Sequence, residues 1–238
     1  NNKKLFSAIE RLISSNLIHI HCDLIFGLPG ETLDDVLNSF EEVCALRPHE
    51  LQLGFLKFLP GSPIKKTIDE FGYEYQSTPP YEFISNNDLS ASQLNYLKKF
   101  EDVFDLFYNS KRFRFTIRNL LKKLSAVDVF NTLLEHMESN NFFNQPNSLN
   151  IQYKIIHDTF SLENDPIALD ILRLDYLYAQ RIYHLPRFLE IDGTRQKTWA
   201  GDRKTPLVPF LHTISILKGV AEVSPSLSPQ YCAVVHSE

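Results

Sequence analysis

Cysteine is scarce in this sequence, which holds only three among its 238 residues: Cys22, Cys44 and Cys232. They lie far apart along the chain, and no pair of them has the spacing of a metal site. The sequence therefore offers no metal-ligand set. Few cysteines, and the lack of a signal-peptide pattern at the N-terminus, predict a reducing, cytoplasmic location. We also expect the chain to begin inside a longer protein.

Long apolar runs and an excess of basic charge are also absent. No stretch approaches the roughly 20 apolar residues that a membrane-spanning helix needs. The net charge of −5, from 29 acidic and 24 basic residues, gives no electrostatic argument for nucleic acid. The 43% of hydrophobic residues is ordinary for a globular protein, and the length allows one large domain or two small ones. We therefore expect no membrane partner, and nucleic acid is not indicated.

A strand, a tight turn and a helix are predicted from residue 17 to residue 44. Residues 17–26 alternate between two faces, which is the period of a β-strand. The apolar face holds Ile18, Ile20, Cys22, Leu24 and Phe26, and the opposite face holds His19, His21, Asp23 and Ile25. Gly27 and Gly30 give the turn its backbone freedom, and Thr32 with Asp35 can cap the helix.

The second face of this strand carries groups that are costly to bury in an apolar core. Two histidines and a carboxylate would be well placed at the mouth of an active site, at the carboxyl end of a parallel strand. A plain strand–turn–helix unit of an α/β protein explains the same pattern. On the residues alone, both interpretations stay open.

The next elements continue an alternation of helices and strands. A helix at 3–14 and a second strand at 51–58 predict, with the strand and helix between them, two parallel strands joined by a crossover. Gly54 in the second strand indicates a bulge or, less commonly, the close approach of a ligand or of neighbouring backbone. Ser62-Pro63 predicts another helix start, with its end at Gly72.

From Asp88 onward the sequence is mainly helical. Apolar residues at helical spacing predict helices at 88–110, 113–123, 126–138, 149–159 and 166–183. Their aromatic stripes are expected to form the core. The basic cluster Lys111, Arg112, Arg114, Arg118, Lys122 and Lys123 is expected to be a solvated helix face. Residues 185–205, with Trp199, are predicted as loop, and strands at 210–217 and 230–236, connected by 224–229, predict a small terminal pair.

Two stretches of the first part resemble a known family. Residues 23–32 read Asp-Leu-Ile-Phe-Gly-Leu-Pro-Gly-Glu-Thr. This resembles the fifth-strand motif of radical S-adenosylmethionine (radical SAM) enzymes, notably the branch related to oxygen-independent coproporphyrinogen oxidase and the methylthiotransferases. Residues 51–64, with their Pro-Gly-Ser-Pro exit, resemble the sixth strand of that branch. The implied fold class is α/β plus mainly α, with the last two strands of a TIM-like (β/α) barrel before a helical domain.

The helical part carries a second resemblance. Residues 80–85, 108–113, 172–177 and 185–189 resemble a C-terminal domain of unknown function that follows the barrel in a group of bacterial radical SAM proteins. The implied regions are a barrel portion at 1–75, the helical domain at 76–190, and a terminal loop with a small strand pair at 191–238. Members of this group often carry an N-terminal cobalamin-binding domain. That domain is absent here, so cobalamin is expected only in the parent protein.

The cysteine triplet Cys-x3-Cys-x2-Cys, which holds the 4Fe-4S cluster of this superfamily, does not occur in the sequence. The first four strands and the usual SAM methionine-binding motif are also absent. The resemblance therefore implies the C-terminal part of an Fe-S enzyme that reductively cleaves SAM to start radical chemistry on an unknown substrate. The parent would need SAM and the cluster as cofactors, and the fragment alone should be inactive.

Four residues are implied as cofactor-binding. Asp23 would hydrogen-bond the SAM ribose, because a carboxylate can accept from two vicinal hydroxyls. Ile25 would lie against the adenine, and the backbone of Lys57 would contact the adenine edge. Gly27 belongs to the turn beside them. No catalytic residue is implied within this chain.

The remaining polar residues of the motif are expected to be structural. Glu31 would cap the next helix, and His19 and His21 would be packed, hydrogen-bonded side chains. Two other functions stay open. One is a non-catalytic module that binds protein or RNA through the helical half. The other is an unrelated α/β protein whose Gly-Leu-Pro-Gly turn binds phosphate at a helix N-terminus. Against it, the sequence lacks the Walker lysine and the dinucleotide-binding Gly-x-Gly-x-x-Gly pattern.

Overall fold

The structure is a computed structural model that describes residues 2–15, 17–146, 148–179, 185–190, 208–210 and 232–234. By compactness the chain divides into two units. One consists of residues 1–109 and 125–130, and the other of residues 110–124 and 131–238. Compactness in space does not define a unit of sequence, so the domain limits predicted at residues 75 and 190 stay predictions.

The first unit alternates helices and strands. Its elements are α1 (Asn2–Ser15), β1 (His21–Phe26), α2 (Leu33–Ala45), β2 (Glu50–Phe55), η1 (Pro63–Thr67), α3 (Ile68–Phe71), β3 (Glu74–Tyr75), β4 (Phe83–Ser85), α4 (Ala91–Phe104), η2 (Asp105–Asn109) and the start of α6 (Ala126–Ser139). β1 and β2 pair in parallel, with His21 opposite Glu50 and Phe26 opposite Phe55. The predicted parallel pair with a crossover helix is confirmed.

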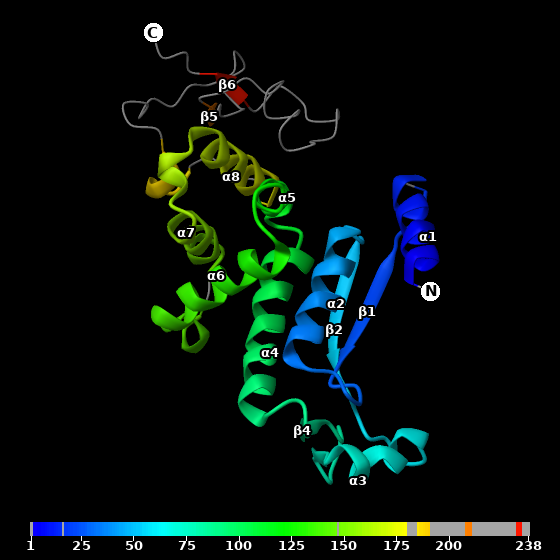
Figure 1. The fold of residues 1–238 in the computed structure, drawn as a ribbon. Helices are drawn as coiled ribbons and strands as arrows, with labels where there is room; N and C mark the ends of the chain where they lie inside the picture. The colour runs from blue at the N-terminus through cyan, green and yellow to red at the C-terminus, as the bar shows by residue number, and fades with distance from the viewer. Residues whose placement is uncertain are drawn as a thin grey trace. The chain divides into compact units, whose positions relative to one another are not determined.

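The crossover helix α2 begins where the sequence predicts, because Thr32 and Asp35 cap each other's amides. Thr32 Oγ1 accepts from the Asp35 amide at 3.3 Å, and the Asp35 carboxylate accepts from the Thr32 amide at 3.0 Å. Val36, Phe40 and Cys44 form the buried side of the helix. Figure 1 shows α2 beside β1 and β2, along one face of the pair.

Buried phenylalanines form the centre of the first unit. The ring centroid of Phe40 on α2 lies 4.9 Å from that of Phe100 and 5.2 Å from that of Phe104, both on α4. Phe130, at the start of α6, lies 4.9 Å from Phe104. All three pairs meet edge to face, which is a favoured geometry for aromatic rings. The aromatic stripes predicted as core are confirmed as core.

The predicted start of β1 is wrong. β1 begins at His21 rather than at residue 17, and Ile18 is 47% exposed although the alternation predicts its burial. The pleat depends on pairing with β2, and that pairing begins at His21. The helix predicted from Ser62-Pro63 to Gly72 is found, as the 3-10 turn η1 followed by α3, although Ser62 makes no side-chain cap. Gly72 ends it in the left-handed conformation.

The second unit is mainly helical. Its elements are α5 (Arg114–Leu120), the rest of α6, η3 (Phe142–Asn144), α7 (Leu149–Thr159), η4 (Leu162–Asn164), α8 (Pro166–Ala179), η5 (Arg187–Leu189), β5 (Val208–Phe210) and β6 (Cys232–Val234). The predicted helices are found, the last of them described as far as residue 179.

β5 and β6 pair in parallel. A terminal strand pair is therefore present, although its first strand precedes most of the predicted 210–217. The predicted connection at 224–229 and Trp199 lie outside the described residues.

The architecture is mixed α/β with a majority of helix. Each sheet in the described ranges has two strands, and no barrel is formed by these residues. Nowhere in the described chain is a helix both long and apolar enough to cross a bilayer.

Candidate functional site

The face of β1 and β2 that is turned away from α2 is open and polar. It carries His21, Asp23 and Ile25 from β1, which stand opposite Glu50, Gln52 and Gly54 from β2. Residues that are opposite in the register of a parallel pair share a face, because side chains alternate along both strands. The predicted division of β1 into two faces is confirmed from His21 onward, with Phe26 buried and Cys22 and Leu24 half-buried on the apolar side.

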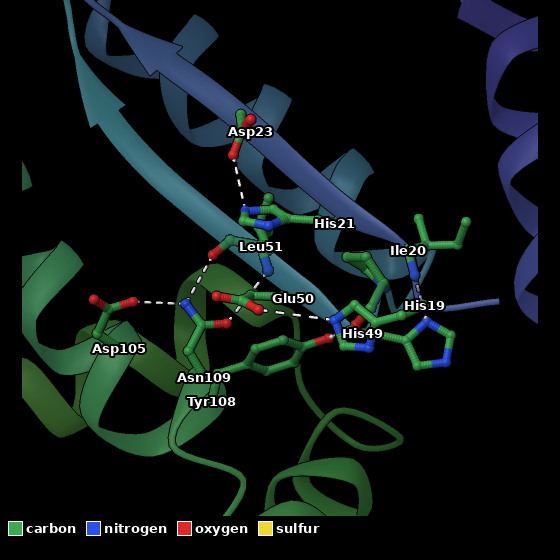
Figure 2. Close-up of polar contacts among 11 residues, drawn as sticks. His19, Ile20, His21, Asp23, His49, Glu50, Leu51, Asp105, Tyr108 and Asn109 are labelled. Atoms are coloured by element: carbon green, nitrogen blue, oxygen red, sulfur yellow. Dashed lines mark hydrogen bonds and ion pairs between the residues drawn. The ribbon is translucent and has the colours of Figure 1, made fainter.

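Asp23 lies in the middle of this face. His21 is its ion-pair partner, with Nε2 3.0 Å from Asp23 Oδ1, and Figure 2 shows the two side chains meeting along β1. A carboxylate can only accept, so His21 Nε2 carries the proton when the two groups attract. The Asp23 side chain is 67% exposed, which leaves its second oxygen accessible to a ligand.

Further histidines gather at the N-terminal end of β1. His19 Nε2 lies 3.8 Å from Glu50 Oε2, and the ring centroids of His19 and His49 are 4.9 Å apart. His49 Nδ1 accepts from the Ile20 amide at 3.0 Å, which links the segments just before the two strands. The side chains of His19 and His21 are 63% and 43% exposed, so the expected packing of these two residues is not found.

A side chain closes the outer edge of β2 (Figure 2). Asn109 accepts from the Leu51 amide at 3.3 Å and donates to the Leu51 carbonyl at 2.8 Å, as a neighbouring strand would. The Asp105 carboxylate accepts from the side-chain NH2 of Asn109 at 2.6 Å, and the Tyr108 hydroxyl donates to the Pro48 carbonyl at 3.1 Å. No local pattern predicts the contact, because Leu51 and Asn109 are 58 positions apart.

The Gly-Leu-Pro-Gly turn after β1 is held by Glu31. Its carboxylate accepts from the amides of Gly27 and Leu28 at 3.0 and 3.2 Å, and its own amide donates to the Leu28 carbonyl at 3.1 Å. Burial raises the pKa of Glu31, and the two amides oppose that shift. The expectation that Glu31 caps α2 is wrong, because Thr32 and Asp35 cap the helix.

Gly27 is required by the space around it. Its φ is 88°, and a Cβ there would lie 2.2 Å from Cζ of Phe83. The Tyr73 hydroxyl donates to the Gly27 carbonyl at 2.8 Å, while the Gly27 amide is bound to Glu31. The protein thus uses both backbone polar groups of Gly27, and a contact of this residue with SAM stays a prediction.

Gly27→Ala is expected to destabilise the first unit by about 1–3 kcal/mol more than Gly61→Ala does. Both glycines have positive φ, so each alanine carries a similar left-handed strain of about 1–2 kcal/mol. An added Cβ at Gly61 meets nothing within 4 Å, whereas Phe83 is buried and its ring has no room to move aside. Urea denaturation followed by circular dichroism measures the difference, and equal losses would contradict the steric argument.

At the carboxyl end of the open face, the aliphatic side chain of Ile25 lies opposite Gly54, which carries no side chain. Ile25 is 51% exposed. The register runs unbroken through Gly54, so the expected bulge is absent. A Cβ on Gly54 would lie 3.6 Å from its nearest neighbour, the Leu24 carbonyl oxygen, which is ordinary contact. Packing does not require glycine here, and without a side chain on Gly54 no group from β2 stands opposite Ile25 on this face.

Lys57 follows β2 and bridges to Glu82 in an antiparallel sense. The two hydrogen bonds of the bridge are made by the flanking residues, at 2.8 and 3.1 Å. In such a pair the amide and carbonyl of Lys57 itself point away from the partner. The backbone at Lys57 therefore keeps a donor and an acceptor for a ligand, while its side chain is exposed.

The structure brings Asp23 and Ile25 onto one face, and Gly27 and Lys57 follow the carboxyl ends of β1 and β2. Sequence reasoning missed Glu50 on this face and Asn109 at its edge. Alternation with the buried Leu51 is the signal that could have placed Glu50. Among the described residues, no three His, Cys, Asp or Glu side chains converge to hold a metal ion.

Comparison with known proteins bears on the part of the chain that follows this face. A family described as a protein of unknown function (DUF4080) matches residues 69–204, which is more than half of the chain. No curated protein matches the chain. The matched range begins after β1 and β2 and does not include the open face.

Proposed function

The chain belongs to the DUF4080 family, and we propose that it is the C-terminal part of a radical SAM enzyme. In this proposal β1 and β2 are the last two strands of a (β/α) barrel whose interior is lined by their open face. The parent enzyme reductively cleaves SAM to start radical chemistry. The observation that carries the proposal is the order along that face, in which an exposed carboxylate at Asp23 is followed by Ile25 beside Gly54.

The two edges of the β1–β2 pair differ. The edge of β1 supports a continuation of the sheet, and the edge of β2 does not. Asn109 occupies the outer edge of β2, whereas no strand in the described part of the chain pairs with the other edge of β1. On α1, which precedes β1, Leu5 and Leu12 are 58% and 44% exposed. An amphipathic helix and a free strand edge need a further strand and helix to cover them. Additional β/α units of a parent barrel would do so.

The residues present fit a nucleoside. Asp23 Oδ2 is accessible to a ribose hydroxyl, the aliphatic surface of Ile25 with Gly54 suits one side of an adenine, and the Lys57 backbone offers a donor and an acceptor for its edge. Few polar groups fixed beside an apolar surface are typical of cofactor sites. SAM, once bound, is the source of the radical. The role of this chain is to bind and orient it.

The other implied cofactors have no ligands here. Cys22 and Cys44 lie on β1 and α2, and neither belongs to a triplet with cluster spacing. The residues of this chain therefore do not fit a 4Fe-4S cluster. No residue is assigned to cobalamin, which belongs to the proposal only through the parent protein.

Asp23→Asn in the full-length parent is expected to weaken SAM binding roughly tenfold to a hundredfold, since a hydrogen bond to a charged group contributes about 1.5–3 kcal/mol. The measurement is a SAM titration of the wild-type and variant proteins, reconstituted under argon. In the 238-residue chain alone, the same substitution should leave the free energy of unfolding within about 0.5 kcal/mol of wild type, because Asp23 is a surface residue.

Asp34→Asn is the matched control, since Asp34 is exposed on the first turn of α2 and belongs to no part of the proposed site. It should bind SAM as the wild type does. Equal affinities of the Asp23 variant and the wild type would remove Asp23 from the site. A wild-type parent that does not bind SAM would overturn the proposed function itself.

The two other functions receive less support. A phosphate at the Gly-Leu-Pro-Gly turn would compete with Glu31, whose carboxylate already accepts the amides of Gly27 and Leu28. In the basic cluster of the helical part, Arg112 donates to Gln152 and Lys123 pairs with Asp165, each at 2.9 Å. These internal contacts favour a structural role for that cluster over a surface for RNA or an acidic partner.

A further inference from the structure

Along β1, His21 lies on the N-terminal side of Asp23. β1 runs from His21 to Phe26, and ligands of parallel sheets bind outside the carboxyl ends of the strands. His21 precedes Asp23 by two residues on the same face, which places it about 6.6 Å further from that end. Its Nε2 lies 3.0 Å from Oδ1 of Asp23, so the histidine that contacts this carboxylate precedes it on the strand.

His21 pairs with Asp23 although other titratable groups lie nearby. Glu50 is opposite His21 in the register, but its carboxylate lies 3.8 Å from His19 Nε2, and the His19 ring in turn packs at a tilt against that of His49. Cys22 belongs to the other face of β1. Figure 2 shows Asp23 and His21 as one group on the strand, with Glu50, His19 and His49 forming a second group toward the N-terminal end.

We propose that His21 is a positioning residue of the SAM site, which holds one carboxylate oxygen of Asp23 so that the other faces the ribose. The proposal rests on the proposed function. An exposed aspartate on a flat strand samples several rotamers, and an ion pair with a neighbour on the same strand selects one of them. His21 acts through Asp23 and needs no contact with SAM.

The test is a double-mutant comparison of SAM binding by the full-length parent. His21→Phe keeps a flat ring but cannot pair with Asp23, so it should bind SAM roughly threefold to tenfold more weakly than the wild type. In the Asp23→Asn background the same change at His21 should weaken binding little further, because His21 acts through the carboxylate.

His19→Phe is the matched control, because His19 lies just before β1 and contacts Glu50 instead of Asp23. It should keep the wild-type affinity. If Asp23→Asn weakens binding while His21→Phe binds SAM as the wild type does, Asp23 needs no positioning and the inference is wrong, although the proposed function stands. If the wild-type parent binds no SAM, both fail together.

The contact can also be measured without SAM. In the 238-residue chain, side-chain couplings of Asp23 measured by nuclear magnetic resonance should show one dominant rotamer in the wild type and several in His21→Phe, because the variant cannot pair with the carboxylate. His19→Phe should keep the single rotamer. Equal rotamer averaging of Asp23 in the wild type and in His21→Phe would show that His21 does not order the carboxylate, which would overturn the inference whatever SAM does.

Discussion

Replacement of Arg173 by alanine is expected to lower the free energy of unfolding of the second unit by about 3–5 kcal/mol. Arg173 is 1% exposed, and its Nη1 lies 2.6 Å from Oδ1 of Asp170, which is fully buried. Its Nε donates to the Leu189 carbonyl at 2.7 Å, which holds η5 to α8. Alanine would leave the Asp170 carboxylate inside the protein without this cation, and that desolvated charge accounts for most of the expected loss.

Guanidinium chloride denaturation followed by circular dichroism measures the loss. Arg187→Ala is the matched control, since Arg187 is exposed on η5 and should change stability by no more than about 0.5 kcal/mol. Replacing both partners, as Arg173→Met with Asp170→Leu, should recover most of the stability, because no buried charge remains. If Arg173→Ala is as stable as Arg187→Ala, the buried pair does not have the importance that its geometry indicates.

The helices of this protein are predictable because their apolar residues recur at helical spacing and their first residues can cap them. α7 occupies the predicted 149–159, with the Ser148 side chain accepting from the Ile151 amide at 3.4 Å. The end of the long helix at 88–110 is different. Its last turn is the π-helical η2, in which Asn109 reaches Leu51. Such a contact depends on where β2 lies, and helical spacing carries no information about that.

The open face of β1 is predictable for a similar local reason. Period two puts His21, Asp23 and Ile25 on one side without any knowledge of neighbours. The roles of Glu31 and Gly54 could not be predicted in this way. A carboxylate in a turn can bind backward or forward along the chain, and Glu31 binds backward to Gly27. Whether a strand glycine marks a bulge depends on its register with the next strand, which the structure shows to be unbroken.

Asp175→Ala is expected to destabilise the second unit by about 2–6 kcal/mol, because two amides lose their acceptors and each loss amounts to about 1–3 kcal/mol. Asp175 is 1% exposed. Its Oδ1 accepts from the Phe115 amide at 3.0 Å and its Oδ2 from the Thr116 amide at 2.7 Å. Both amides are in the first turn of α5, where the helix itself provides no acceptor.

A graded series tests this assignment. Asp175→Asn keeps one carbonyl oxygen and turns an NH2 group toward the other amide. Its free energy of unfolding should therefore lie between that of the wild type and that of Asp175→Ala. Chemical denaturation of the three proteins under identical conditions gives the order. Loss of the cap should also shorten α5, and an unchanged hydrogen-exchange rate at the Phe115 and Thr116 amides in Asp175→Ala would refute the capping role.

The wild type should also lose stability between about pH 5 and about pH 8, and Asp175→Asn should lose less. Burial raises the pKa of Asp175 to about 7, against the effect of the two amides. An acid whose pKa is higher in the folded than in the unfolded chain binds its proton more tightly when folded, so protonation stabilises the fold. This stabilisation is complete below about pH 4, the ordinary range of aspartate, and is lost as the pH rises through about 7. Between about pH 5 and about pH 8 the loss amounts to about 3 kcal/mol, since about two of these pH units lie below the folded pKa of about 7 and each corresponds to about 1.4 kcal/mol. Urea denaturation of both proteins at the two pH values measures this loss, and parallel losses would assign the pH dependence to groups other than Asp175.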